Sequence, residues 1–420
     1  MARDPRARSP RLLVLGAGPA QLGLLEAARA SGVWTAVADR DPAAPGFRLA
    51  DRRCIVSTED EPALERLAAA LDPDGIVSPG TDWPVAVAAR IADKLGLPHP
   101  ISPQTAVLAT NKLRQRERLA AAGVAQPRWQ VVTDGAVEIE PPCVVKAPDR
   151  QGQKGLTLVR TRKELAPAVA TARAASRSGA ALVEALVDGP EVTVLGFDGR
   201  SLLVTDRVTA DPPAFGVALA HVWPTHLEGQ TRRMARGDAS EGQTQGTSLG
   251  DASEGQTLGA AERAVAALGI ERGPTYTQLR VGADGPQVVE VAARLGGGHD
   301  AELAQAALGI PLNDWTIDAA LGRSPQVRDC YKPQVGGAVT RFLLAPPGVL
   351  ERVEVPDDLE GVLRVRIYRQ AGFVVGPLRR GADRAGAVLA VGDSREQALA
   401  RADAAAERIR FVTADAGALV

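Results

Sequence analysis

The pattern of hydrophobic and polar residues along residues 11–100 is typical of an α/β domain, in which strands alternate with helices. Short apolar runs such as Leu12–Leu15 are followed by longer segments in which apolar residues recur every three or four positions. Because strands that alternate with helices usually pair in parallel, we expect a doubly wound parallel sheet with helices on both faces. The predicted strands are 11–15, 33–38 and 75–78, and the predicted helices are 21–31, 61–71 and 82–95.

The pattern changes after a charged helix predicted at 110–123. From Cys143 to about Val194, short strands, a glycine-rich loop and one helix (163–176) indicate a small α+β unit. More strands and helices follow, and a last helix is predicted at 394–409. We therefore expect three domains: residues 1–108, a two-lobed domain at 109–325 with its small lobe at about 125–185, and an α+β subdomain at 326–420.

One octapeptide is repeated within the second predicted domain. GDASEGQT occurs at 237–244 and again at 250–257. The segment is almost free of apolar residues, so it cannot bury enough surface to order itself. We expect an exposed insertion at about 236–258; a mobile flap next to an active site is the alternative.

The composition is that of an ordinary globular protein. The 420 residues are 45% hydrophobic and 24% charged, with a formal net charge of −1, so no overall field attracts nucleic acid or an anionic membrane. No apolar run approaches the roughly 20 residues of a membrane span. Cys54, Cys143 and Cys330 match neither a disulfide framework nor a zinc site, and each is expected to be a small buried hydrophobe. We expect a cytoplasmic protein without nucleic-acid or membrane partners.

The first strand and turn resemble a dinucleotide-binding fingerprint. Gly16 and Gly18 follow a strand, and Asp39 stands at the end of the next strand, where it could bind a ribose. Gln21, however, occupies the position at which a third glycine allows close helix–strand packing, and Gly23 comes two residues late. A dehydrogenase is therefore only an alternative reading.

Lysine is rare in this chain, and half of its lysines lie between residues 112 and 154. Only six of the 49 basic residues are lysine, and Lys112, Lys146 and Lys154 are three of them. Lys146 ends the apolar strand CVVK, and Lys154 lies in the loop Gly152–Gly155 before the next strand. A glycine loop between two strands can close over a polyphosphate through its N–H groups and its lysine. The alternative is a surface hairpin with a lysine at its tip.

Two acids seven positions apart follow this loop. Glu184 lies in the strand LVEALV, and Glu191 comes after the turn Asp188-Gly189-Pro190. Next to a polyphosphate loop, Glu184 could accept from an adenine amino group and Glu191 from ribose hydroxyls. Backbone groups of Ala185–Val187 could then face the edge of the base. Read alone, one of the two could be a surface charge at the end of a strand.

A predicted hairpin carries candidate metal ligands. Strands at 275–280 and 287–291 flank the turn at 282–285, which can bring Gln278 and Glu290 onto one face. Their oxygens suit Mg²⁺ when phosphate oxygens complete its octahedron. Arg294 follows and could grip a carboxylate or phosphoryl group with two hydrogen bonds.

Taken in order, these motifs resemble the ATP-grasp superfamily and in particular its carboxylate–amine ligases. The matching features are the VVK strand, the glycine loop with lysine, the spaced pair of glutamates, and an acidic residue leading into AARLGGG. The resemblance covers nearly the whole chain. The segment LGAGPAQLGLLEAA is similar to the family's Rossmann-like pre-ATP-grasp domain, and residues 337–411 are similar to its closing subdomain.

The resemblance implies ATP and Mg²⁺, or Mn²⁺, as cofactors and assigns a role to each matching residue. Lys112 and Lys146 would contact phosphates, and Gly152, Gln153, Lys154 and Gly155 would form the flexible loop. Adenosine would be held by Glu184, Ala185, Val187 and Glu191, and metal by Glu290 and Gln278, while Arg294 and Lys154 would stabilise the transferring phosphoryl group.

This chain departs from the family at two positions that normally ligate magnesium. Gln278 replaces a glutamate, and Ala292 replaces an asparagine. The expected site therefore loses negative charge, and the number of metal ions stays open.

The function expected from the resemblance is ligation of a small-molecule carboxylate to an amine through an acyl phosphate, with release of ADP and phosphate. Two alternatives stay open: activation of bicarbonate, as in aminoimidazole ribonucleotide carboxylases, and nucleotide binding with weak catalysis. A homodimer is expected from the family alone.

Overall fold

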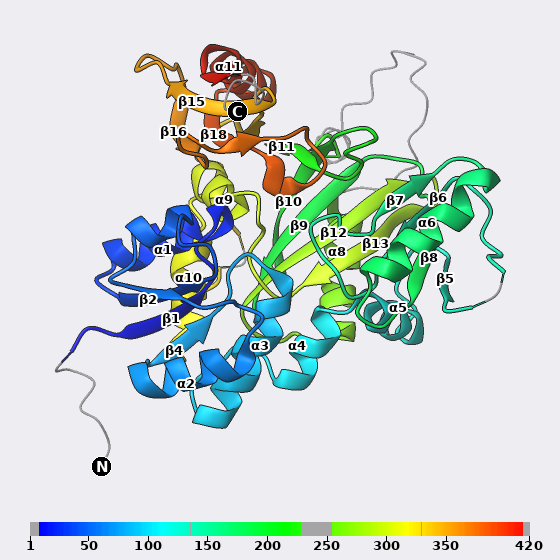
Figure 1. The fold of residues 1–420 in the computed structure, drawn as a ribbon, viewed down its shortest axis with the longest axis horizontal. Helices are drawn as coiled ribbons and strands as arrows, with labels where there is room; N and C mark the ends of the chain where they lie inside the picture. The colour runs from blue at the N-terminus through cyan, green and yellow to red at the C-terminus, as the bar shows by residue number, and fades with distance from the viewer. Residues whose placement is uncertain (1–7, 135, 228–253, 329, 415–420) are drawn as a thin grey trace.

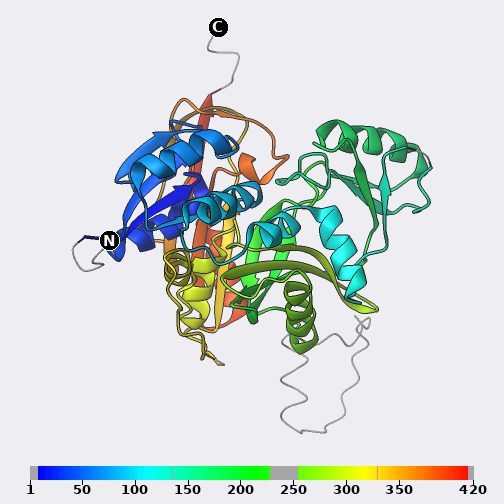
Figure 2. The same cartoon turned by 90° about the horizontal axis from the view of Figure 1, so that it is seen from below.

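The computed structural model describes residues 8–134, 136–227, 254–328 and 330–414, which form four sheets (Figure 1). A parallel sheet lies in the N-terminal domain, and a large antiparallel sheet connects this domain to a small lobe. The small lobe has a sheet of its own, and a three-stranded sheet lies near the C-terminus. Seen from below, the small lobe stands at one end of the molecule and the N-terminal domain at the other (Figure 2).

The N-terminal domain is the doubly wound parallel sheet that the sequence predicts. Its strand order is β3-β2-β1-β4, and every neighbouring pair is parallel. Side chains alternate along the central strand, so Leu12 and Val14 pack beneath one set of helices, whereas Leu13 and Leu15 pack on the opposite face. The elements are β1 (Arg11–Leu15), α1 (Leu22–Ala30), β2 (Trp34–Asp39), β3 (Arg52–Ile55), α2 (Glu61–Leu71), β4 (Gly75–Val77) and α3 (Asp82–Leu95).

Two helices from much later in the sequence lie next to this domain. Helix α10 (Leu312–Ala320) packs with α1 on the same face of the parallel sheet, where Trp315 joins the core. Helix α9 (Asp300–Leu308) precedes it. Part of the predicted second domain therefore buries its apolar face against the first.

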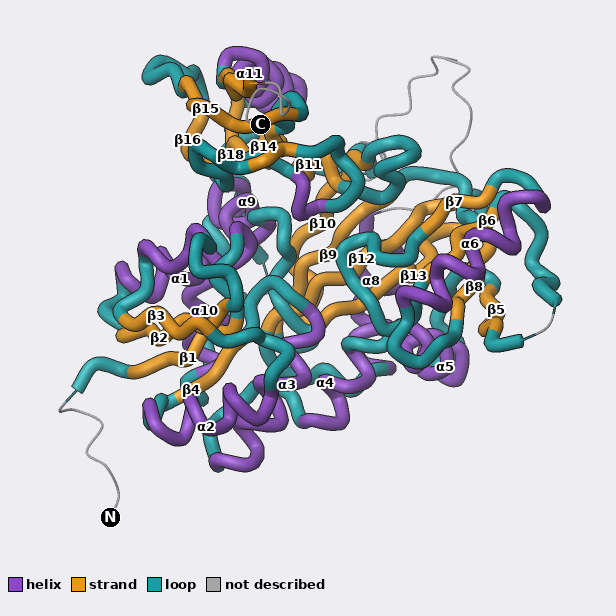
Figure 3. Tube along the Cα trace, in the orientation of Figure 1, coloured by secondary structure: helices purple, strands orange, loops and turns teal. Residues whose placement is uncertain are grey.

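The large sheet has eight antiparallel strands in the order β13-β12-β9-β10-β11-β14-β18-β16 (Figure 3). The last three strands come from the predicted C-terminal subdomain, so that region extends the sheet of the preceding domain. The predicted boundaries at 108/109 and 325/326 stay predictions. The strands are β9 (Glu191–Phe197), β10 (Arg200–Thr209), β11 (Ala218–Trp223), β12 (Pro274–Gly282), β13 (Gly285–Ala292), β14 (Gly337–Leu343), β16 (Val362–Ile367) and β18 (Gly386–Gly392).

The small lobe directs alternate side chains toward the large sheet. Its strand order is β5-β8-β6-β7, with helix α6 on one face. Cys143 and Val145 pack in the core beneath α6, so Val144 and Lys146 point from the opposite face. The elements are β5 (Trp129–Val132), β6 (Cys143–Lys146), β7 (Thr157–Val159), α6 (Arg162–Ala175) and β8 (Ala181–Ala185).

The remaining described elements lie around the large sheet and at the C-terminus. Helix α11 packs on β14 and β18, and a separate sheet has the order β17-β15-β19. These elements are α4 (Pro103–Ala109), α5 (Lys112–Ala121), α8 (Glu254–Ala267), β15 (Gly348–Glu354), β17 (Val374–Val375), α11 (Arg395–Arg408) and β19 (Arg410–Ala414).

Two expectations need correction. The predicted insertion at about 236–258 lies mostly outside the described residues, but its last residues belong to α8, which begins at Glu254 and buries Thr257. Cys330 is exposed, whereas Cys54 and Cys143 are buried as expected. Among the described residues, no helix combines the length and the apolar character that a membrane crossing requires.

Candidate active site

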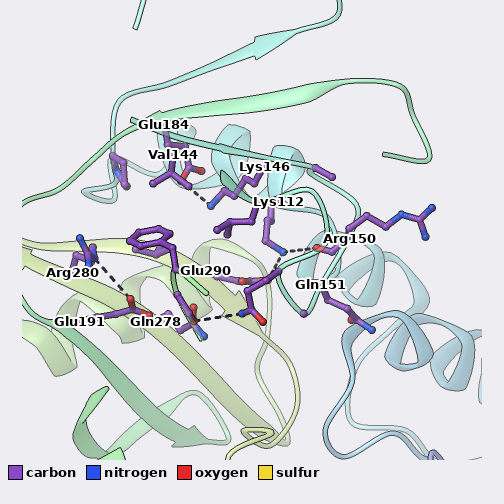
Figure 4. Close-up of a pocket in the computed structure, with 18 of the residues that line it drawn as sticks. Lys112, Val144, Lys146, Arg150, Gln151, Glu184, Glu191, Gln278, Arg280 and Glu290 are labelled. Carbon is purple, nitrogen blue, oxygen red and sulfur yellow. Dashed lines mark hydrogen bonds and ion pairs between the residues drawn. The ribbon is translucent and has the colours of Figure 1, made fainter. Parts of the chain in front are cut away.

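A cavity between the small lobe and the large sheet collects all but one of the predicted site residues. Figure 4 shows side chains from both lobes arranged around it. Gly155 is the exception: its φ is +71°, and an added Cβ would lie 2.7 Å from the Cβ of Ala175, so it is packed against α6. The predicted residues that line the cavity are Lys112, Lys146, Gly152, Gln153, Lys154, Glu184, Ala185, Val187, Glu191, Gln278, Glu290 and Arg294.

Glu184 holds two cations at the small-lobe side of the cavity. One of its oxygens lies 2.7 Å from Nζ of Lys146, and the other accepts from Nε of Arg116 at 2.7 Å. All three side chains are buried. Burial raises the pKa of Glu184, but Arg116 and Lys146 outweigh it and hold that pKa below its usual value. Burial lowers the pKa of Lys146, and Glu184 opposes that shift. With Lys146 protonated, one carboxylate faces two cations, and the group carries a net positive charge.

This arrangement differs from the one that the sequence suggested for Glu184. A carboxylate that already accepts from two cations is poorly placed to receive an adenine amino group as well. The predicted contact with adenine stays untested, and the observed contacts assign Glu184 to holding Lys146. Arg116 was missed because a buried arginine on a charged helix has the same sequence pattern as an exposed one.

Lys112 and Glu290 form an ion pair on the large-sheet side. The lysine Nζ lies 2.7 Å from a Glu290 oxygen and also donates to the backbone oxygen of Arg150 at 3.0 Å. Burial opposes charge on both groups, yet the pair interaction raises the pKa of Lys112 and lowers that of Glu290. Both groups are therefore charged at neutral pH.

The β12–β13 hairpin brings the two predicted metal ligands together. Gln278 and Glu290 are direct partners in the register of the antiparallel pair, as the hairpin pattern predicts. Ala292, on the same strand as Glu290, offers no side-chain donor. Among the described residues, no three His, Cys, Asp or Glu side chains gather as a metal-binding group. One carboxylate and one amide oxygen suit a single cation whose remaining ligands are phosphate oxygens.

Arg294 extends from the large sheet toward the N-terminal domain. Its Nε donates to Oδ1 of Asp82 at 2.6 Å, and its Nη1 donates to the Leu295 oxygen at 2.8 Å. Asp82 is the first residue of α3, and no sequence motif predicts that it reaches this site. This ion pair joins the N-terminal domain to the cavity and fixes the direction of the guanidinium group.

The predicted phosphate loop is held at both sides. The Gln151 side-chain oxygen accepts from the backbone N–H groups of Asp82 and Trp83, at 2.8 and 3.2 Å. Gln153 accepts from the Gly381 N–H at 3.2 Å and itself has a φ of +62°. The loop thus bridges the N-terminal domain and the C-terminal region at the cavity.

Glu191 pairs with two arginines of the large sheet. One oxygen accepts from Arg207, and the other lies 3.8 Å from Nε of Arg280. All three residues line the cavity. The predicted contact between Glu191 and a ribose stays a prediction, and Arg207 is a further site residue that no motif identified.

A second cavity adjoins the first. The two share Asp82, the loop residues 151–153, Arg207, Gln278 and Arg294. Tyr276, His221 and Gly298 line the second cavity alone, together with side chains from the C-terminal region. A ligand there would lie directly beside a group bound at Arg294.

The turn that resembles a dinucleotide fingerprint is filled by its own side chains. Asp39 accepts from the Ala17 N–H at 2.8 Å. Gln21 is buried, and a Cβ added at Gly16 would lie 3.0 Å from its side chain. The glycines therefore make room for Gln21, which favours a structural role for this turn.

Comparisons with known proteins cover nearly the whole chain. Residues 341–414 match a family model described as "L-amino acid ligase C-terminal domain 2". The chain is 29% identical over 382 residues to the protein named "Uncharacterized protein y4rH" from Sinorhizobium fredii, which covers 85% of this chain and 73% of that protein.

Solved structures share the same architecture. An L-amino acid ligase from Bacillus licheniformis superposes with a TM-score of 0.77 at 21% identity, covering 97% of this chain and 100% of that chain. The biotin carboxylase domain of a Hydrogenobacter thermophilus 2-oxoglutarate carboxylase, in complex with MgADP, ADP and bicarbonate, superposes with a TM-score of 0.76 at 18% identity, covering 96% and 90%. The chain has the ATP-grasp fold.

Proposed function

We propose that this protein is an ATP-dependent carbon–nitrogen ligase that couples a carboxylate to an amine through an acyl phosphate. The observation that carries the proposal is the meeting of the predicted nucleotide residues in one cavity that opens into a second. The first cavity has the charges for a triphosphate, and the second has room for the reactants. A cytoplasmic location and a homodimer belong to the same proposal as expectations.

The nucleotide would lie between the small lobe and the large sheet. Lys146 and Lys112 supply positive charge from opposite sides of the cavity, and Lys154 comes from the loop above it. Glu290, with the amide oxygen of Gln278, would hold the Mg²⁺ or Mn²⁺ ion of the nucleotide, which neutralises phosphate charge. The related fold from Hydrogenobacter thermophilus, solved with MgADP, supports this assignment.

Arg294 stands where the two cavities meet. Its guanidinium is oriented by Asp82, and only 13% of the side chain is exposed. Charge that develops on the transferring phosphoryl group and on the acyl phosphate would be stabilised there without reorganisation of solvent. The loop held by Gln151 and Gln153 would keep water from hydrolysing the acyl phosphate.

An amine is favoured over bicarbonate chemistry by the C-terminal region. Residues 341–414 match the L-amino acid ligase model, and Tyr368 and Arg384 from this segment line the second cavity. The region that resembles amine ligases therefore contributes to the space where the acceptor would bind.

The test is a screen of ADP release over a panel of carboxylates crossed with amines, with bicarbonate as a separate arm. We expect ADP release that requires both a carboxylate and an amine, together with an amide product detected by mass spectrometry. ADP release that depends on bicarbonate alone would favour the carboxylating alternative. Absence of nucleotide turnover in every arm would contradict the proposal.

A further inference from the structure

A buried histidine–aspartate pair lies at the second cavity. His221 is on β11, and Asp300 is the first residue of α9. Nδ1 of His221 is hydrogen-bonded to Oδ1 of Asp300, and the two side chains are 2% and 1% exposed. The other Asp300 oxygen accepts from the Gly298 N–H at 3.0 Å. Both carboxylate oxygens therefore have partners.

The pair fixes which nitrogen of His221 is basic. Burial raises the pKa of Asp300, but His221 and the Gly298 N–H outweigh this and lower it, so the carboxylate stays ionised. An ionised carboxylate at Nδ1 requires the proton of the neutral imidazole on that nitrogen. The lone pair is then on Nε2.

The His221 ring lines the second cavity, and its Nε2 side lies next to Gly298. A Cβ added at Gly298 would lie 3.1 Å from this nitrogen and 2.7 Å from the neighbouring ring carbon. Within the described parts of the chain, Nε2 has no hydrogen-bond partner. Gly298 and His221 line the cavity that also contains Arg294. The free Nε2 thus belongs to a ring in the wall of the cavity that adjoins the proposed site of the acyl phosphate.

The surroundings of this space are cationic. Arg207 and Arg384 interact electrostatically with Asp300, and both line the same cavity. Among the described residues, His299 and Tyr276 also interact electrostatically with Asp300. An ammonium ion entering beside these arginines is disfavoured relative to a neutral amine. An amine substrate, which is protonated in water at neutral pH, must therefore give up a proton as it binds or reacts.

We propose that His221 is the general base that deprotonates the attacking amine, and that Asp300 is its positioning residue. This inference rests on the proposed ligase function. The ammonium gives one proton to Nε2, and the nitrogen lone pair forms the C–N bond. The C–O bond to the phosphoryl group then breaks, phosphate leaves with the electron pair, and it takes the second proton of the adduct.

A second histidine–aspartate pair in the chain provides a matched control. Nδ1 of His226 lies 2.5 Å from Asp206, which also binds Arg395. His226 is 77% exposed in its side chain and lines neither of the two cavities. The two pairs share residue types and differ in access to the reactants, so only the His221 pair should affect amide formation.

Hydroxylamine separates the two half-reactions. It is largely unprotonated at neutral pH and attacks an acyl phosphate without help from a base, giving a hydroxamate. With ATP and the carboxylate, His221→Asn should form hydroxamate within about twofold of wild type, while amide synthesis falls about 100-fold or more. Asp300→Asn should show the same split to a smaller extent, and His226→Asn should change neither rate.

A second variant tests the geometry while both side chains of the pair stay in place. Gly298→Ala places a methyl group against the imidazole, so amide synthesis should fall while hydroxamate formation is retained. Amide synthesis at the wild-type rate in folded His221→Asn would overturn the inference. Equal loss of amide and hydroxamate in both His221→Asn and Gly298→Ala would overturn it too, because it indicates a structural role. If wild type forms no hydroxamate from any carboxylate, the ligase proposal itself is wrong.

Discussion

Lys112 and Glu290 neutralise each other across the floor of the cavity, with Nζ and a carboxylate oxygen 2.7 Å apart. In the proposed complex this ion pair breaks: the lysine binds phosphate, and the glutamate binds the metal ion. Removing the carboxylate alone should therefore free the lysine. We expect Glu290→Gln to bind metal-free ADP several-fold more tightly than wild type, because the cavity gains net positive charge. Calorimetric titration in a chelator measures this, and weaker binding would contradict it.

The metal site should hold one ion. Wild type has one carboxylate and one amide on the hairpin, so we expect one nucleotide-dependent Mn²⁺ per chain, counted by electron paramagnetic resonance of the free ion. Gln278→Glu adds a second carboxylate and should raise metal affinity, with a second ion at high Mn²⁺. Two tightly bound ions in wild type would contradict this, because they would show that Gln278 does not reduce the number of ions that the site binds.

Lys146 and Arg294 should each be required for turnover. Lys146→Ala and Arg294→Ala remove charge from opposite ends of the phosphate site, and we expect carboxylate-dependent ADP release to fall about 100-fold or more. Lys163→Ala, at an exposed position of α6, is the control and should keep wild-type turnover. Near-normal rates in either site variant, with circular dichroism unchanged, would remove its assigned role.

The loop should open when Gln151 is shortened. Gln151→Ala loses two hydrogen bonds to the start of α3, so trypsin should cleave after Arg150 or Lys154 about tenfold faster. Gln130→Ala removes hydrogen bonds within the small lobe and should leave cleavage of the loop unchanged. An unaltered cleavage rate in Gln151→Ala would mean that other contacts hold the loop.

A buried acid network should make stability depend on pH. Burial raises the pKa of Glu302, but hydrogen bonding to His299 and the charge of Arg366 lower it to about 2. A depressed carboxylate pKa contributes stability above the unfolded-state value, and that contribution is lost as pH falls toward 2. Glu302→Gln should therefore lower the free energy of unfolding at pH 7.

The difference between Glu302→Gln and wild type should shrink as pH falls below about 4.3, the ordinary glutamate value. Glu407→Gln, at an exposed position of α11, should match wild type throughout. Urea unfolding between pH 3 and 7 measures both variants. A difference that stays constant over this range would contradict the role of the ionised Glu302.

Sequence reasoning found the elements whose side-chain period is strong. Helices α2 and α3 have their predicted bounds, and Gln278 faces Glu290 as the hairpin spacing predicts. Strand β3 was not predicted, because three of its four residues are exposed and the segment has the sequence pattern of a polar loop. Short helices such as α4 were missed because seven residues cannot display a clear helical period.

The site was harder to predict where it depends on pairing between distant charges. The fold brings Asp82 and Arg207 to the cavity and Arg116 to Glu184, and nothing local distinguishes these residues from surface charges. The partners of Glu184 and Glu191 escaped prediction for the same reason, since each carboxylate meets arginines that the motif does not contain. Their predicted contacts with adenine and ribose stay predictions. Motifs locate backbone features well, whereas the partners of a charge emerge only in three dimensions.

The central claim is that the oxygen of a carboxylate is phosphorylated in this cavity. The most direct measurement uses a turnover reaction with ¹⁸O-labelled carboxylate, an amine and ATP, followed by ³¹P NMR of the released phosphate. The proposed mechanism predicts that each phosphate carries one ¹⁸O atom from the carboxylate. Phosphate without the label, or release of AMP and pyrophosphate instead of ADP, would contradict it.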